Sequence, residues 1–386
     1  MNSIERVSAA IDHKKADRAP LSYEATYEVT EGLIERFQLN KLKEPSGAAS
    51  ASNQPTAGEK KKYGQFHEIE LQKRLGVDQI ILTCPTSAKK TIGNWWGLPL
   101  LERLPGGVLL GAWGIKFQEV VYPYGTYIEI ESSPLRGERS LAELKAFSVP
   151  SLDLWDFDAL RPLTPKYEDF FIWLNMNGCF DLARFMRGTE EFMVDFATEP
   201  EKAEVLLDKV NDLAIAYFEE CMARVGGKVH GVYCGDDFGT QRGLLMSPAM
   251  WRTFIKPRYK KLISAIKSRG IKYCHHSCGG VRPIIPDLIE VGLDVLNPIQ
   301  PLAVGMEPAE LGDTFGEALA FYGGIDEQRT LPNGSRDDVR KEVLDRLRTL
   351  GKHGGYIVAP SHAFQPDTPQ ENVLAVYETV LGHTLS

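Results

Sequence analysis

The residues most able to carry chemistry cluster in the segment YCHHSCGG, residues 273–280, which follows a short apolar run. Successive side chains of a strand point to opposite faces, so His276 and Cys278 share one face at the strand end. Zinc accepts such a histidine–cysteine pair, and the two glycines allow a sharp turn close to a ligand. We therefore predict that His276 and Cys278 bind zinc. The alternative is an inert buried cysteine beside a hydrogen-bonded histidine.

A second histidine lies in APSHAFQPDTP, residues 359–369, directly after the last predicted strand. His362 is therefore expected at the mouth of the sheet, where it supplies a third metal ligand. Three protein ligands leave one coordination position open, as a catalytic zinc requires. The alternative is a capping loop in which Asp367 or Thr368 precedes Pro369 at a helix start. The two interpretations use different residues, so both can hold.

Adjacent carboxylates form a third candidate group in VYCGDDFGTQ, residues 232–241. We predict that Asp236 or Asp237 acts as a catalytic acid or base, or as a fourth zinc ligand. The alternative is helix capping or loop hydrogen bonding, which aspartates commonly provide.

A glycine pair follows another predicted strand, in FYGGIDEQ at residues 321–328. Gly323 and Gly324 are candidates for binding a large cofactor or a phosphate-like group. The alternative is a structural turn, because the segment matches no phosphate-binding motif.

Strands alternate with helices along most of the chain, and this predicts the elements that position these residues. Apolar runs predict strands over residues 77–82, 229–234, 271–275, 294–297, 319–323 and 355–359. Helical spacing predicts helices over residues 200–225, 250–267, 336–350 and 369–381, the second interrupted at Pro257. This rhythm indicates parallel βαβ units and about eight strands, that is, a (β/α)8 TIM barrel of the α/β class. Reactive residues of such barrels lie at the C-terminal ends of the strands.

The first third of the chain departs from this rhythm. We predict an N-terminal helical elaboration over residues 1–75, with a mobile loop at 43–62 that is rich in Ala, Ser, Gly, Pro and Lys. Residues 107–132 read as a β-hairpin excursion from the barrel. The whole chain, residues 1–386, is expected to form one domain.

Charge and cysteine content exclude several classes of function. A net charge of −8 argues against a nucleic-acid partner or an anionic membrane surface. The sequence has no apolar run of the ~18 residues that a membrane helix needs, and the charged N-terminus is no signal peptide. We therefore expect a cytoplasmic protein, in which six cysteines are reduced and a clustered pair suggests metal binding or catalysis.

Four segments resemble the uroporphyrinogen decarboxylase superfamily, both in sequence and in their order along the chain. They are HHSCGGVRPIIPDLIEVGLDVLNPIQP (275–301), GDDFGTQRG (235–243), GGID (323–326) and APSHAFQPDTPQENV (359–373). The decarboxylases of this superfamily carry an arginine-rich N-terminal segment that holds the substrate's carboxylates. Here the matching stretch is LSYEATYEVTEGLIERF, whose first arginine is Arg36. The chain is more similar to the zinc-dependent methyltransferases that act with corrinoid proteins, such as the methylcobalamin:coenzyme M methyltransferases.

This resemblance implies zinc ligands at His276 and Cys278, and it places His362 where those methyltransferases have a second cysteine. One thiolate and two neutral histidines leave zinc with about one net positive charge, which makes it a stronger Lewis acid. We therefore hypothesise an oxygen-linked methyl donor, as in an O-demethylase, over a thiol substrate. If Asp236 or Asp237 supplied a fourth ligand, the net charge of the zinc centre would be zero and this charge argument would no longer apply.

The expected activity is methyl transfer between a small O- or S-linked methyl compound and a corrinoid (cobalamin) carried by a partner protein. The resemblance also allows a homodimer. Two rival functions stay open: a metal-free decarboxylase, which needs arginines such as Arg242, Arg258 and Arg282 at the mouth, and a non-catalytic barrel that binds a tetrapyrrole or corrinoid. Aromatic residues, including Trp95, Trp96 and Trp113, belong either to the pocket wall or to the core.

Overall fold

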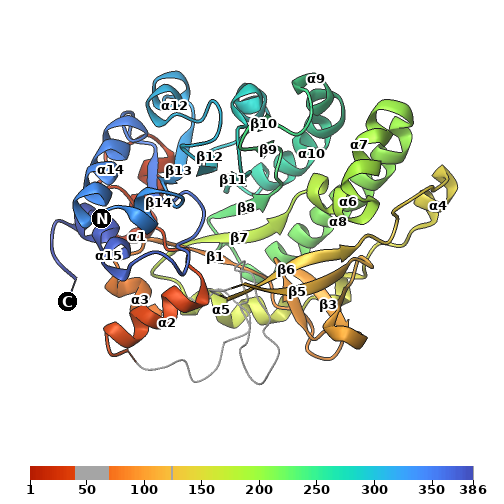
Figure 1. The fold of residues 1–386 in the computed structure, drawn as a ribbon, viewed down its shortest axis with the longest axis horizontal. Helices are drawn as coiled ribbons and strands as arrows, with labels where there is room; N and C mark the ends of the chain where they lie inside the picture. Colours follow the sequence, from red (N-terminus) through yellow and green to blue (C-terminus); the bar gives the residue numbers. More distant parts are fainter. Residues whose placement is uncertain (40–68, 123–124, 386) are drawn as a thin grey trace.

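The computed structural model describes residues 1–39, 69–122 and 125–385 (Figure 1). Its centre is a parallel sheet in the order β1-β7-β8-β11-β12-β13-β14. These strands are β1 (Gln79–Leu82), β7 (Phe171–Asn177), β8 (Gly231–Gly235), β11 (Lys272–His276), β12 (Val295–Ile299), β13 (Ala320–Ile325) and β14 (Tyr356–Pro360). Six of them are buried along nearly their whole length, and β11 is buried at its three central residues, as expected for a parallel sheet covered on both faces.

A short N-terminal segment closes the sheet into a barrel. The Ser22 amide donates to the Val358 carbonyl at 3.0 Å, and the Val358 amide donates to Pro20 at 2.9 Å. On the other side, the Asp78 amide donates to the Leu21 carbonyl at 2.9 Å. Residues 20–22 therefore bridge β14 and the start of β1, where an eighth strand would lie. The predicted barrel is confirmed, with this segment completing the ring in place of a full strand.

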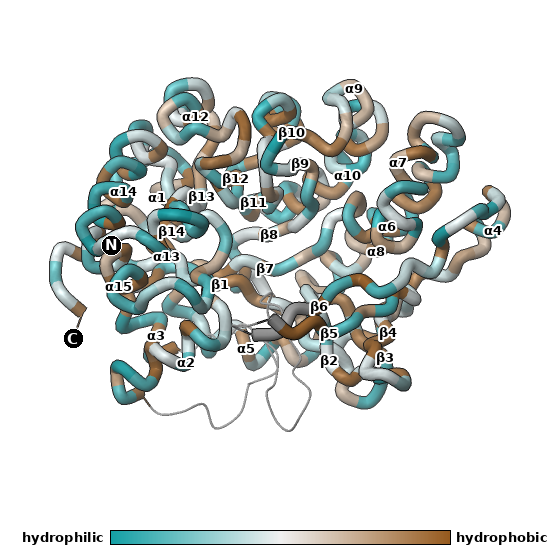
Figure 2. Tube along the Cα trace, viewed as in Figure 1, coloured by the Kyte–Doolittle hydropathy of each residue, from teal (hydrophilic) through white to brown (hydrophobic). Residues whose placement is uncertain are grey.

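Helices cover the outside of the barrel (Figure 1). In Figure 2 they alternate between hydrophilic and hydrophobic along their turns, as expected when one helix face packs on a sheet. Their bounds are α1 (Ser3–Ile11), α2 (Tyr27–Arg36), α3 (Ile69–Arg74), α4 (Leu141–Ala146), α5 (Leu160–Lys166), α6 (Cys179–Arg187), α7 (Thr189–Thr198), α8 (Pro200–Val225), α9 (Pro248–Met250), α10 (Lys256–Lys267), α11 (Ile285–Glu290), α12 (Pro308–Phe315), α13 (Thr330–Asn333), α14 (Arg336–Thr349) and α15 (Gln370–Leu381).

The excursion after β1 is larger than the predicted hairpin. Five antiparallel strands form it: β2 (Gly93–Trp95), β3 (Leu98–Arg103), β4 (Leu109–Gly111), β5 (Lys116–Tyr122) and β6 (Gly125–Ser132). Trp113 and Phe117 are buried within it. Figure 1 shows this sheet beside β1 and β7, so it builds one side of the barrel mouth.

Several local predictions can be compared with the structure. A turn of π-helix at Trp251–Ile255 precedes α10, so the helix is interrupted just before Pro257, as predicted. Ser335 caps α14 through a reciprocal hydrogen bond with Asp338. The loop predicted at residues 43–62 lies outside the described residues. Among the helices that are described, none combines the length and the hydrophobicity needed to cross a bilayer.

Candidate metal centre and adjoining cavity

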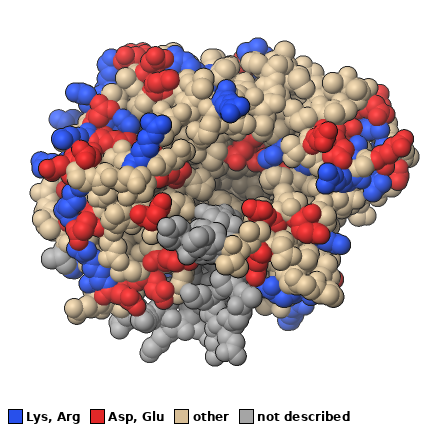
Figure 3. All heavy atoms as spheres, viewed as in Figure 1, with Lys and Arg blue, Asp and Glu red and all other residues tan. Residues whose placement is uncertain are grey.

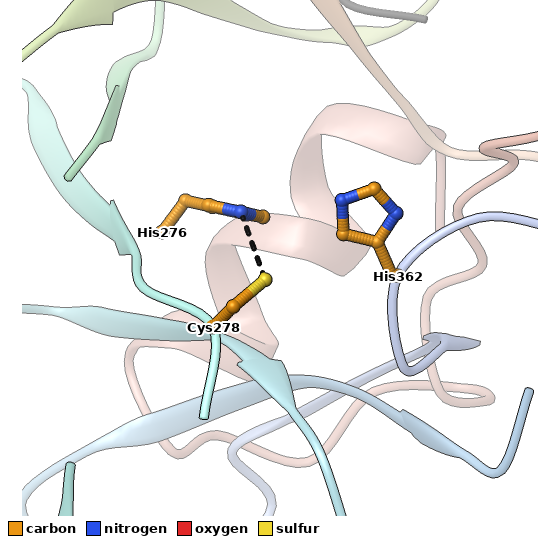
Figure 4. Close-up of side chains that lie close together, drawn as sticks. All are labelled: His276, Cys278 and His362. Carbon is orange, nitrogen blue, oxygen red and sulfur yellow. Dashed lines mark hydrogen bonds between the residues drawn. The ribbon is translucent and has the colours of Figure 1, made fainter. Parts of the chain in front are cut away.

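His276, Cys278 and His362 converge at the barrel mouth (Figure 4). Their ligand atoms all lie within 4.8 Å of one another. The His276 Nε2 and Cys278 Sγ atoms are 3.6 Å apart, and the two imidazole rings are 5.7 Å apart and nearly perpendicular. His276 ends β11 and His362 follows β14, two strands that are not neighbours in the sheet. Curling of the sheet therefore brings together two histidines, His276 and His362, that are 86 positions apart in the chain.

Two polar side chains fix the tautomer of His276. Its Nδ1 lies 2.7 Å from Asn297 Oδ1 and 2.6 Å from the Tyr233 hydroxyl, and that hydroxyl donates to the same Asn297 oxygen at 2.7 Å. The asparagine amide nitrogen donates to the Tyr322 carbonyl, which assigns Oδ1 to the histidine side. Because an amide oxygen only accepts, Nδ1 must carry the proton. In the neutral imidazole, Nε2 then carries a lone pair that faces the cluster, as a metal-binding histidine requires.

The other two residues are also suited to a cation. Burial, followed by the neighbouring His276, lowers the pKa of His362 to about 4, so its imidazole is neutral at neutral pH. Burial, followed by the charge of Asp237, raises the pKa of the Cys278 thiol well above its usual range. A thiolate at this position therefore needs a positive partner. Two imidazoles and one sulfur form a donor set typical of zinc, and the arrangement leaves room for a further ligand.

The two adjacent aspartates have different environments. Both oxygens of Asp236 accept hydrogen bonds of 2.7 Å, from the Phe180 and Asp181 amides at the start of α6 and from the Tyr259 hydroxyl. A side chain at Gly178 would collide with this carboxylate, at 2.3 Å. Asp236 is therefore committed to capping α6, the alternative function that the sequence left open.

Asp237 lies beside the three candidate metal ligands. Its Oδ1 accepts from the Cys278 amide at 2.7 Å and lies 4.0 Å from His276 Nε2. The side chain is 39% exposed, so its second oxygen is accessible from the cavity. Of the two predicted acid–base residues, the structure brings only Asp237 to the cluster with a free oxygen.

The glycine pair does not contact the cavity. Gly323 and Gly324 lie inside β13 with φ angles of +108° and +95°. A Cβ on Gly323 would approach the Ile299 amide nitrogen at 3.1 Å, and one on Gly324 would approach Leu350 at 2.9 Å. Gly323 is therefore explained by close packing against β12, and Gly324 by close packing against the end of α14. Neither glycine lies where it could bind a cofactor at the barrel mouth.

Two partly buried glutamates lie near the site, Glu24 and Glu327, and the sequence did not single out Glu327 as functional. Glu24 accepts hydrogen bonds from Tyr322 and Ser22, and burial raises its pKa to about 7. Glu327 accepts from the Ala363 amide at 3.1 Å and donates its own amide to Ser361 at 3.2 Å. It therefore braces the turn that holds His362. Glu327 follows the GGID motif by one residue, which is the only sequence signal for it.

A cavity of about 260 Å³ opens in front of the cluster. Figure 3 shows the hollowed face, with acidic side chains at its rim. The lining comes from the excursion, from β7, β8 and α6, and from the cluster itself: Trp95, Trp96, Leu98, Ile128, Asn175, Met176, Asn177, Gly178, Asp181, Leu182, Phe185, Tyr233, Gly235, Asp236, Asp237, His276 and His362. The predicted pocket residues Trp95 and Trp96 are here, whereas Trp113 is 3% exposed and lines a separate small cavity.

Fold and site together define an α/β barrel with polar residues at the C-terminal ends of its strands, the usual location of active sites in such barrels. The uroporphyrinogen decarboxylase (URO-D) family model matches residues 108–383. The chain therefore belongs to the uroporphyrinogen decarboxylase family, as the four motifs predicted.

Two sequence relatives and one solved structure illustrate what this chain is similar to. A uroporphyrinogen decarboxylase of Thermus thermophilus is 29% identical over 176 residues, 45% of this chain and 47% of the relative. A uroporphyrinogen decarboxylase of an Anaeromyxobacter species is 25% identical over 251 residues, 63% and 68% of the two chains. The chain thus spans about half the length of the first of these relatives. A methyltransferase from Methanosarcina mazei matches the fold over 99% of both chains, with a TM-score of 0.67 at 19% identity.

Proposed function

We propose that this protein transfers a methyl group between a small O- or S-linked methyl compound and a corrinoid carried by a separate protein. The single observation that carries the proposal is the convergence of His276, Cys278 and His362 within 4.8 Å beside a cavity. These three residues would hold zinc. When bound, zinc supplies Lewis acidity that polarises a heteroatom in its open position.

The chain's own residues prepare this chemistry. Tyr233 and Asn297 hold the His276 ring with Nε2 toward the cluster, and burial keeps His362 neutral. In transfer from an ether, the carbon–oxygen bond would break with its electron pair staying on oxygen, and the reduced corrinoid of the partner protein would supply the pair for the new bond. Asp237, which is 39% exposed beside His276, would exchange a proton with the leaving oxygen.

The rival activity is decarboxylation, which the names of the sequence relatives favour. A substrate bearing several carboxylates needs cationic partners, yet no lysine or arginine is among the described residues that line the cavity. Arg258 pairs with Asp208 at 2.7 Å, and Arg282 pairs with Glu310 at 3.1 Å, both outside the cavity. The third candidate, Arg242, is exposed on the 239–244 hairpin. The charge of the cavity therefore supports methyl transfer over decarboxylation.

Methyl transfer to free cob(I)alamin, in place of the corrinoid protein, tests the proposal. Purified protein is mixed with an aryl methyl ether or a methyl thioether, and methylcobalamin is followed by its absorbance. We expect turnover that a zinc chelator abolishes and that Cys278→Ala loses. Cys221→Ala is the matched control, because Cys221 is a buried cysteine on α8 and is not a member of the cluster. Chelator-insensitive decarboxylation of uroporphyrinogen, with no methyl transfer, would contradict the proposal.

A further inference from the structure

The described wall of the cavity offers an anion no cationic side chain. Three of its lining residues are acidic, Asp181, Asp236 and Asp237, and the lining that the structure describes contains no cationic side chain. Arg184 lies over the adjoining Phe185 ring, but it is ion-paired with Asp181. A negatively charged group entering this space would lose its hydration without gaining a cationic side chain from the described wall, which is unfavourable.

Two asparagines turn hydrogen-bond acceptors toward the same space. The Asn177 side-chain nitrogen donates to the Trp96 carbonyl at 2.9 Å, which fixes the amide orientation. The Asn175 side-chain nitrogen donates to the Thr83 hydroxyl at 3.2 Å. Both residues line the cavity, so their side-chain oxygens are the groups left for a ligand. The cavity therefore favours a ligand that donates hydrogen bonds, such as a hydroxyl group.

The apolar part of the wall has the size and shape for an aromatic ring. Trp95, Trp96 and Phe185 line it, and the Trp95 and Phe185 rings are 6.4 Å apart. Trp96 adopts a φ of +53°, a backbone conformation that bulky residues rarely take. The cavity volume of about 260 Å³ exceeds the ~150 Å³ of a cavity that accepts benzene. The neighbouring cavity at Trp113 measures about 40 Å³ and cannot hold a ring.

From these three features we infer that the methyl donor is an uncharged aromatic methyl ether that carries a hydroxyl group, and that anionic donors are excluded. The ring would pack among Trp95, Trp96 and Phe185, where aromatic pairs gain beyond simple burial. Its hydroxyl would donate to Asn177, and its methoxy oxygen would face His276 and His362. This inference rests on the proposed function and specifies the substrate class of the same site.

Ligand binding to the protein as purified, measured by isothermal titration calorimetry, tests the inference without any turnover. The probes are 2-methoxyphenol, methoxybenzene and 3-methoxybenzenesulfonate, whose sulfonate is a weak metal ligand. We expect 2-methoxyphenol to bind about tenfold or more tightly than the sulfonate, because the described wall offers the anion no cationic side chain. We also expect it to bind about threefold or more tightly than methoxybenzene, because of its donated hydrogen bond.

A charge-reversing variant sharpens the test. Phe185→Lys places a cation in the wall and should shift the preference toward the sulfonate. Phe185→Leu, the matched neutral variant, removes the same ring, so it should weaken binding of all three aromatic probes and leave their order unchanged. Wild-type protein that binds the sulfonate as tightly as 2-methoxyphenol would overturn the inference. The proposed function is tested separately. If the protein prefers 2-methoxyphenol but methylates cob(I)alamin from no donor, the inferred ligand class is supported and the proposed methyl transfer is contradicted.

Discussion

Removing the Tyr233 hydroxyl should weaken zinc binding although this residue is not a ligand. The hydroxyl lies 2.6 Å from His276 Nδ1 and hydrogen-bonds the Asn297 oxygen that also holds this nitrogen. Tyr233→Phe leaves the Asn297 contact at 2.7 Å, so it removes about one hydrogen bond, or about 1 kcal/mol and fivefold in affinity. Asn297→Leu removes the amide oxygen that can only accept from Nδ1, and it also removes the acceptor to which the tyrosine hydroxyl donates. We expect about tenfold to a hundredfold weaker zinc binding there, as for other residues that orient a metal ligand.

The assay is competition for zinc with a chromophoric chelator at constant pH. Tyr273→Phe is the matched control, because the Tyr273 hydroxyl contacts the neighbouring His275 at 3.1 Å, and that histidine is buried away from the cluster. This control should lose some stability and keep its zinc affinity. Equal zinc affinities in Tyr233→Phe and Tyr273→Phe would refute the view that the Tyr233–Asn297 pair positions His276.

Three further predictions concern other parts of the site. Burial raises the pKa of Glu24 to about 7, so the folded protein retains a proton that the unfolded chain releases, and stability falls as pH rises from about 4.5 to about 7. Glu24→Gln, which mimics the protonated acid, should match the wild type in urea unfolding at pH 4 and exceed it by on the order of 2 kcal/mol at pH 8; an unchanged pH dependence would contradict this. Asp236→Ala should lower the free energy of unfolding by about 2–4 kcal/mol, because it uncaps α6, while Asp237→Ala should change it little; equal losses in the two urea titrations would remove the capping role. His362→Cys should retain zinc and shift preference from methyl ethers to thiols, because a second thiolate lowers the charge of the centre; unchanged selectivity in the cob(I)alamin assay would defeat the charge argument.

The barrel was predictable because its strands and helices alternate so regularly. The strands that carry the site, β11 and β14, appear in the sequence as apolar runs directly before polar motifs. Strand β7 escaped prediction, since FFIWLNMN lacks alternation and lies between a proline-rich connection and a helix. The contacts of residues 20–22 that close the barrel could not be predicted either, because a β-bridge of one residue pair leaves no periodic pattern in the sequence.

The convergence of the three candidate metal ligands was predictable from their positions after strands, whereas the roles of the surrounding residues were not. His276, Cys278 and His362 follow strands whose ends must meet at one face of a barrel, so their convergence follows from topology. Asp236 and Asp237 are adjacent in the sequence and indistinguishable there. Only the packing of α6 against β8 shows that one caps a helix and the other faces the cavity.

The most direct test of the central claim is the metal content of the purified protein and of three variants. His276→Ala, Cys278→Ala and His362→Ala each remove one member of the cluster. The account predicts about one zinc per chain in the wild type and loss of zinc in all three variants, with the fold retained by circular dichroism. A wild type that holds no zinc under conditions that preserve it in other zinc enzymes, or variants that bind zinc as the wild type does, would contradict the account.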